Sequence, residues 1–152
     1  MELNRLLELD VGFAYSVNNI SISCMLNNIE KGDFALTEYE EKEIPLEATI
    51  YKIVKGIPIN IVSTAKRIDG KTQWNIVKGN NELRNIIKWI QDGVTVTING
   101  KNATFENLDE DGKKFILNER HPLISTIIDS KYGFDKGSLS SDDLMEIIHT
   151  YS

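Results

Sequence analysis

Apolar residues recur at helical spacing in several parts of the chain. The clearest stretch is 80–92, where they follow the three- and four-residue spacing of one helix face and Gly93 marks the end. The same spacing predicts other helices: an opening helix at Leu3–Leu7, one from Ile20 to Gly32, one from Pro45 to Gly56, one from Lys113 to Arg120, and a last one from Ser140 or Ser141.

Strands are predicted where apolar and polar residues alternate or where short apolar runs stand between turns. Over 94–98, valine and isoleucine alternate with threonine, and Asn99-Gly100 supplies a two-residue type I′ turn. The segment 13–17 is apolar but matches no element. Other predicted strands are Phe34–Leu36, Pro58–Val62 and Trp74–Val77. Helices and strands in irregular order favour an α+β class, with a small mixed sheet, a β-hairpin and packed helices in one domain over 1–152.

The pattern also predicts the surroundings of individual residues. Asn80 or Asn81 is expected to cap the helix that follows. Cys24 stands in an apolar stretch and is interpreted as a buried, inert thiol. Two sets are assigned to the core, namely Ile50, Ile53, Val54 and Ile57 on one helical face, and Trp74 and Trp89 as packing residues.

Charge and composition narrow the classes of function. The chain has 152 residues, a formal net charge of −6 and a pI near 5.0, which disfavours nucleic-acid binding because such domains are normally basic. No apolar run approaches the ~20 residues of a membrane span, so no membrane partner is expected. The N-terminus lacks a signal-peptide layout, and a single cysteine cannot form an internal disulfide. A cytoplasmic location is expected.

Four blocks of the sequence follow one another in an order found in a known family. They are Gly32–Glu41, Gly56–Ile59, Lys78–Leu83 and Phe105–Asp109, and the tail Gly133–Ser138 extends the match. In this order the chain resembles the ParB-like N-terminal domain of GmrSD-type modification-dependent restriction enzymes, of the ParB/sulfiredoxin-like superfamily. The resemblance covers about residues 19–150 and implies a ParB/sulfiredoxin-like fold.

The signature of that family is altered in this chain. The third block reads Asp-Gly-Gln-Gln-Arg-Leu in relatives, and here Lys78 replaces the aspartate and Glu82 the arginine. In the first block Tyr39 matches, whereas Glu40-Glu41 replaces Gln-Arg. The resemblance implies that active relatives use the lost carboxylate and arginine on phosphate groups or in metal-assisted hydrolysis. No catalytic residue is therefore assigned, and the chain is interpreted as a catalytically inactive copy.

Some ligand-binding capacity could survive this change, although a plain turn and helix cap also explains Gly79-Asn80-Asn81. Arg84 lies two residues beyond Glu82, so it is expected on another helix face. If binding is retained, the residues expected to carry it are Lys78, Gly79, Asn80, Asn81, Arg84 and Tyr39.

Two charged clusters are further candidates, although a solvated surface also explains each. A docking face for a basic protein is expected at Glu38, Glu40, Glu41 and Glu43, and a phosphate contact at a hairpin turn at Lys66, Arg67 and Lys71. His121, His149 and the stretch Asp109–Asp111 lack metal-ligand spacing, so neither a metal nor a cofactor is expected.

Three hypotheses follow. The first is an inactive ParB-like domain that works by binding a protein, as a phage or mobile-element product that modulates a host or defence protein. The second is a residual NTPase or nuclease that uses Lys78, Asn80, Asn81 and Arg84. The third is a nucleic-acid-binding module, which the net charge disfavours.

Overall fold

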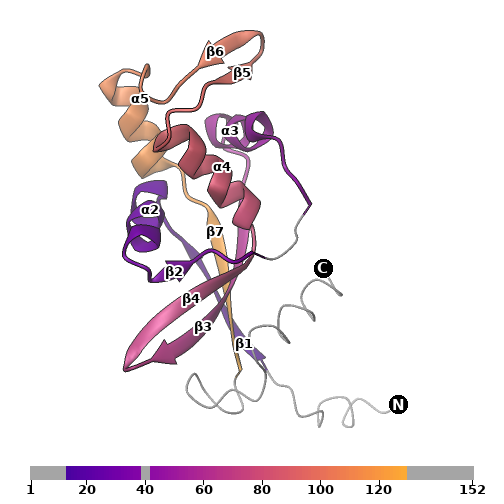
Figure 1. Cartoon of the computed structure of the whole chain (residues 1–152), viewed down its shortest axis with the longest axis vertical. Coiled ribbons are helices and arrows are strands. Elements are labelled where there is room, and N and C mark those ends of the chain that lie inside the picture. Colours follow the sequence, from indigo (N-terminus) through magenta and orange to yellow (C-terminus); the bar gives the residue numbers. More distant parts are fainter. Residues whose placement is uncertain (1–12, 39–41, 130–152) are drawn as a thin grey trace.

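The computed structural model describes residues 13–38 and 42–129, in which helices pack on a mixed β-sheet (Figure 1). The described helices are α2 (Ile22–Glu30), α3 (Leu46–Lys55), α4 (Asn80–Ile90) and α5 (Glu110–Lys114), the last continued by a π-helix at Phe115–Glu119. The strands are β1 (Phe13–Asn19), β2 (Phe34–Ala35), β3 (Asn60–Ile68), β4 (Lys71–Lys78), β5 (Val96–Ile98), β6 (Lys101–Ala103) and β7 (Leu123–Asp129). The α+β class is confirmed.

The main sheet has the strand order β1-β7-β3-β4-β2. β1 and β7 are antiparallel, β7 and β3 are parallel, β3 and β4 form an antiparallel hairpin, and β2 adds two residues parallel to β4. The apolar segment 13–17, which the sequence pattern left unassigned, belongs to β1. The strand predicted at 74–77 lies within the longer β4, whereas the one predicted at 58–62 begins two residues before β3, which starts at Asn60 and continues to Ile68.

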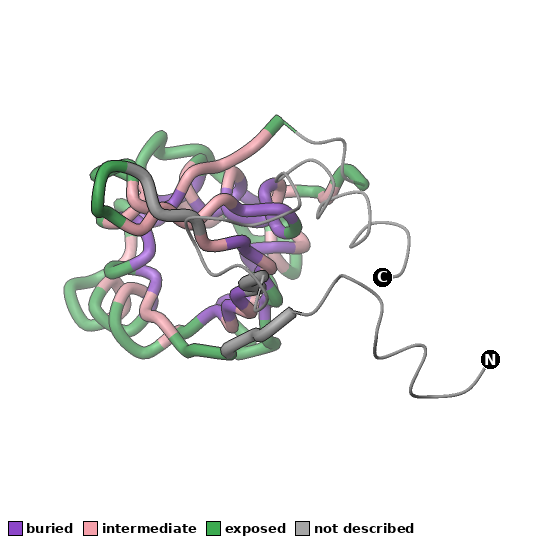
Figure 2. The backbone as a smooth tube through the Cα atoms, turned by 90° about the horizontal axis from the view of Figure 1, so that it is seen from below, coloured by how far each residue is buried: buried purple, intermediate pink, exposed green. Residues whose placement is uncertain are grey.

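Helices α2, α3 and α4 meet the sheet in a core of aliphatic side chains (Figure 2). Ile50, Ile61, Ile76 and Leu83 are each completely buried. Trp89 is 1% exposed and forms an edge-to-face pair with Phe105 at 5.5 Å between ring centroids. Trp74 is half-buried against Phe34 in a similar pair. Both tryptophans are therefore packing residues, as predicted.

The Asn99-Gly100 turn is confirmed. Asn99 and Gly100 have φ angles of 52° and 77°, as a type I′ turn requires, and they join β5 to β6 in a separate two-stranded sheet. The Trp89 indole N–H donates to the carbonyl of Ala103 at 3.3 Å. This contact places the hairpin beside α4, as expected.

Several local predictions are wrong in detail. Val54 and Ile57 are 41% and 45% exposed, and Ile57 lies beyond the end of α3 at Lys55, where Gly56 turns the chain with a φ of 75°. Cys24 is exposed, because the inner face of α2 is formed by Ile22, Met25 and Leu26. Pro45 stands at the N-cap of α3, one residue before its first turn. The helices predicted at 3–7 and from 140 lie outside the described residues.

No helix among the described residues is long and apolar enough to cross a membrane.

Candidate functional site

The altered signature lies at the junction where β4 runs into α4. Gly79 is the N-cap residue, with a φ of 99° in the left-handed region. A Cβ at this position would stand 2.5 Å from Cδ1 of Ile61 and 3.3 Å from the carbonyl oxygen of Asn60. The glycine is therefore required by close approach of the protein's own β3, whereas the sequence had suggested approach of a ligand.

The side chain of Asn80 is buried in an internal hydrogen-bond network. Asn80 is 0% exposed, and its Oδ1 accepts from the backbone N–H of Thr37 at 2.9 Å. Its Nδ2 donates to the Thr37 hydroxyl at 3.0 Å and to the carbonyl of Ile76 at 3.1 Å. The prediction that an asparagine side chain caps α4 is wrong, because no side chain caps the helix. The amide of Asn80 instead connects Thr37, in the chain that leaves β2, to β4.

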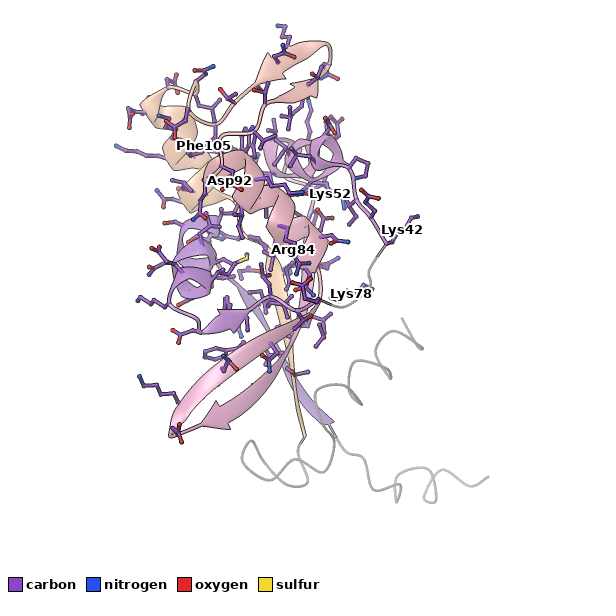
Figure 3. All side chains as sticks on the ribbon, in the orientation of Figure 1. Lys42, Lys52, Lys78, Arg84, Asp92 and Phe105 are labelled. Atoms are coloured by element: carbon purple, nitrogen blue, oxygen red, sulfur yellow. The ribbon has the colours of Figure 1, made fainter. Side chains whose placement is uncertain are left out.

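Arg84 continues the same contact one helical turn further on. Its Nη2 donates to the carbonyl of Thr37 at 2.6 Å and lies 3.5 Å from the carboxylate of Glu38. Arg84 thus faces the chain that leaves β2, whereas Glu82 faces α3, which confirms that the two side chains lie on different faces of the helix. Figure 3 shows Arg84 on α4 and Lys78 at the end of β4.

Asn81 and Asn85 hold the chain that enters α3. The Nδ2 of Asn81 donates to the carbonyl of Lys42, and the Nδ2 of Asn85 donates to the carbonyl of Ile44, each at 3.0 Å. Four polar side chains of α4, at 80, 81, 84 and 85, therefore bind main-chain groups on both sides of residues 39–41. We name residues 38–47 the acidic segment; its glutamates are Glu38, Glu40, Glu41, Glu43 and Glu47.

Glu82 connects α3 and α4. Its side chain is 7% exposed, and its carboxylate accepts from the Thr49 hydroxyl and from Nζ of Lys52, the latter at 2.8 Å. Asn85 adds a hydrogen bond to the same Thr49 hydroxyl at 3.0 Å. The negative charge at this signature position is therefore paired within the protein.

The remaining predicted site residues lie at the surface or outside the described chain. Lys78, Glu38 and Glu43 are exposed, and the Glu38 side chain is 99% exposed. Tyr39, Glu40 and Glu41 lie outside the described residues, as does His149. Figure 3 shows Lys42 on the outer side of the acidic segment.

The basic cluster does not form the turn of the β3–β4 hairpin. The turn is Asp69-Gly70, with φ angles of 51° and 78°. Lys66 and Arg67 belong to β3, where they pair with Gln73 and Thr72, and the exposed Lys71 begins β4. The hairpin turn predicted between these two strands is confirmed. Asp69-Gly70 carries its left-handed conformation, which lets the strands continue up to it, so Lys66 and Arg67 lie in β3 and not in the turn.

The described residues contain no group of three or more His, Cys, Asp or Glu side chains that could hold a metal ion. His121 is exposed, and its Nε2 lies 2.9 Å from the carbonyl oxygen of Asn118. Asp109 caps α5 by accepting from the N–H of Gly112 at 2.7 Å. The predicted helix start at Asp109–Asp111 is confirmed.

The sequence reasoning missed Thr37, Thr49, Lys52 and Asn85. One signal was available, because Glu82 and Asn85 stand three residues apart next to the apolar face of α4, where an unpaired polar residue would be costly. Their partners lie more than 30 positions away, so the sequence pattern could not identify them.

Comparison of the chain with protein-family models, with curated proteins and with solved structures gives no match. The resemblance to ParB-like domains stays a prediction from the sequence.

Proposed function

We propose that this chain is a non-catalytic, ParB-like binding domain that recognises the basic surface of a partner protein through the acidic segment. The observation that carries the proposal is the set of contacts from α4 to the main chain of this segment and of Thr37, the residue just before it. Asn80 and Arg84 bind Thr37, and Asn81 and Asn85 bind Lys42 and Ile44. Residues that would act on a ligand in active relatives serve here to hold a loop.

This anchoring prepares the segment for binding. Main-chain groups face α4, while Glu38, Glu43 and Glu47 are exposed to solvent. A loop that is already held in place loses less conformational entropy when a partner binds, so more of the interaction energy appears as affinity. Clustered carboxylates also speed encounter with a positively charged partner.

The altered signature supports binding over catalysis. The glutamate that replaces the family's arginine is paired with Lys52, and the asparagine amide is saturated by Thr37 and Ile76. We place such a domain in a phage or mobile element, where it would act as an antagonist or decoy of a host or defence protein. No observation favours the hydrolase or the nucleic-acid module.

A charge-reversal capture experiment tests the proposal. The tagged chain is compared with a triple variant, Glu38→Lys, Glu43→Lys and Glu47→Lys, in cross-linked pull-downs from host lysate. A matched control carries Glu30→Lys, Asp92→Lys and Glu106→Lys, three exposed positions away from the segment.

Each triple variant replaces three negative charges by three positive ones, which raises the net charge from −6 to zero. We expect a protein that the wild type and the control capture equally and that the segment variant loses, with weaker capture at higher salt. Capture that survives in the segment variant, or the absence of any specific protein in all three, would refute the proposal.

A further inference from the structure

A cavity of about 280 Å³ lies between the end of α3, the turn that follows it and the chain that enters β7. Its walls are mainly aliphatic, with Ile22, Ile53, Ile57, Ile59 and Leu123 among the lining residues. None of its lining residues belongs to the acidic segment or to the block Lys78–Leu83, although the lining residue Lys52 is paired with Glu82. A hollow with apolar walls and a few polar groups is the usual form of a small-ligand site.

Arg120 lines this cavity, and its planar guanidinium group is held between the Phe115 ring and Gly56. Its guanidinium carbon lies 4.4 Å from the centroid of the Phe115 ring. Its Nη1 would stand 3.0 Å from a Cβ at Gly56, so only glycine leaves room for the guanidinium here. Nη2 donates to the carbonyl of Val54 at 3.0 Å. The group is thus positioned before any ligand arrives.

The hydrogen-bonding capacity of this guanidinium is only partly used. Nε is buried and has no acceptor, and no described residue accepts from Nη1. Arginine has five N–H donors, and a partly buried one is normally matched by a carboxylate. Among the described residues no carboxylate lies within 4.0 Å of Arg120. Its positive charge therefore has no anionic partner there.

The other charged groups around the cavity leave this charge uncancelled. Lys52 reaches the cavity but is paired with Glu82 at 2.8 Å. Glu119 lines the rim and is exposed, and His121 has its Nε2 against a backbone carbonyl. The nearby carboxylate of Glu119 would oppose a ligand that carries several negative charges.

We propose that this cavity binds a ligand with a single carboxylate on a compact apolar body, held by Arg120. The carboxylate accepts from the unused N–H groups of Nη1 and Nη2, because the buried Nε is not accessible to a ligand. The apolar body replaces water against the isoleucines and Leu123. Such a ligand is either a small carboxylic acid or the C-terminal residue of a polypeptide.

Arg120 also has a structural role, because its bond to Val54 satisfies a carbonyl at the end of α3. That role uses one donor of Nη2. It accounts neither for the unused donors nor for the aliphatic hollow beside them. The test must therefore separate ligand binding from stabilisation of the helix end.

The test uses NMR spectra of the whole chain titrated with 4-methylpentanoate and, separately, with its neutral amide. We expect the acid to shift the methyl resonances of Ile53, Ile57 and Leu123 and the Nε–H of Arg120. Because only the acid carries the charge, we expect the amide to bind at least about tenfold more weakly. This comparison needs no substitution and stands even if a variant fails to fold.

Two variants complete the experiment. Arg120→Gln is expected to lower the affinity for the acid by about tenfold or more, whereas Lys88→Gln, which removes an exposed cation that does not line the cavity, leaves it unchanged. An acetylated tripeptide ending in leucine, with a free or an amidated carboxyl, then distinguishes the two sources of the carboxylate. Tighter binding of the free-acid peptide than of its amide indicates a polypeptide terminus. Binding of 4-methylpentanoate without binding of either peptide indicates a small molecule.

The proposal fails if acid and amide bind equally, or if a folded Arg120→Gln variant keeps its affinity. It also fails if no cavity resonance moves at ~10 mM acid, because the binding free energy would then be weaker than about −3 kcal/mol.

Discussion

The carboxamide of Asn80 holds Thr37 from two sides. Its Oδ1 accepts from the Thr37 backbone N–H at 2.9 Å, and its Nδ2 donates to the Thr37 hydroxyl at 3.0 Å. The hydroxyl in turn donates to the carbonyl of Ile76 at 2.8 Å. A closed network of this kind fixes the chain that leaves β2 against β4, so the side chain of Asn80 is structural in this protein.

Asn80→Ala is expected to lower the free energy of unfolding by about 2–4 kcal/mol, because it leaves the Thr37 backbone N–H without its acceptor and removes one of the two donors to the Ile76 carbonyl. The comparison is Asn102→Ala, which removes an exposed hydrogen bond to Thr97 and should cost under about 1 kcal/mol. Urea unfolding of both variants measures the difference. Equal costs would show that the network around Asn80 adds no stability beyond a surface hydrogen bond.

Glu82 and Lys52 should show strong energetic coupling. Removing one member of a mostly buried ion pair leaves the other charge uncompensated, so we expect Glu82→Ala to cost about 2–4 kcal/mol. Lys52→Met should cost at least as much, because it leaves the Glu82 carboxylate, whose side chain is only 7% exposed, without its cation. In a double-mutant cycle the coupling energy is expected to reach about 1–2 kcal/mol. A coupling near zero would mean that the joint between α3 and α4 depends on packing alone.

Local chemistry made part of the fold predictable from the sequence. The Asn99-Gly100 turn was recoverable because both residues must adopt positive φ angles, and few other residue pairs do so readily. Helix α4 was recoverable because its apolar residues repeat over three turns before Gly93. Phe13–Asn19 was not, because its place as a strand depends on pairing with β7, more than 100 residues away.

The candidate site was less predictable than the fold. Asn80 was expected to cap its own helix, which is the local preference of asparagine, but a buried partner 43 positions away prevailed. The pairing of Glu82 with Lys52 was missed because it depends on how α3 packs against α4. The unmatched charge of Arg120 was missed because the sequence does not show which carboxylates lie near it.

Gly79→Ala and Gly93→Ala should differ although both glycines have positive φ angles. At Gly93 the added Cβ meets nothing within 4 Å, so only the conformational strain of about 1 kcal/mol is expected. At Gly79 the same atom would lie 2.5 Å from the buried Ile61, and the expected cost rises to about 2–4 kcal/mol.

Ile61→Val removes the colliding methyl group and provides the check. The double variant Gly79→Ala, Ile61→Val should lose less stability than the sum of the two single variants, as chemical denaturation can show. Strict additivity would indicate that the collision with Ile61 does not determine the requirement for glycine.

Nucleoside triphosphates should not stabilise this chain. To bind phosphates at the altered signature, Asn80 and Arg84 would have to release Thr37, and Glu82 would offer no positive charge. We therefore expect no change in the thermal midpoint with ATP, GTP, CTP or UTP, with or without magnesium, and no phosphate release above background in the wild type or in Asn81→Ala. A functional site at a hundredfold excess of ligand over its Kd would add ~2.7 kcal/mol, which raises the midpoint of a chain of this size by roughly 5–10 °C. A rise of this size in the thermal midpoint with one nucleotide, and its loss in Arg84→Ala, would contradict the non-catalytic proposal. The side chains of α4 that hold the acidic segment would then be able to release it and bind a nucleotide instead.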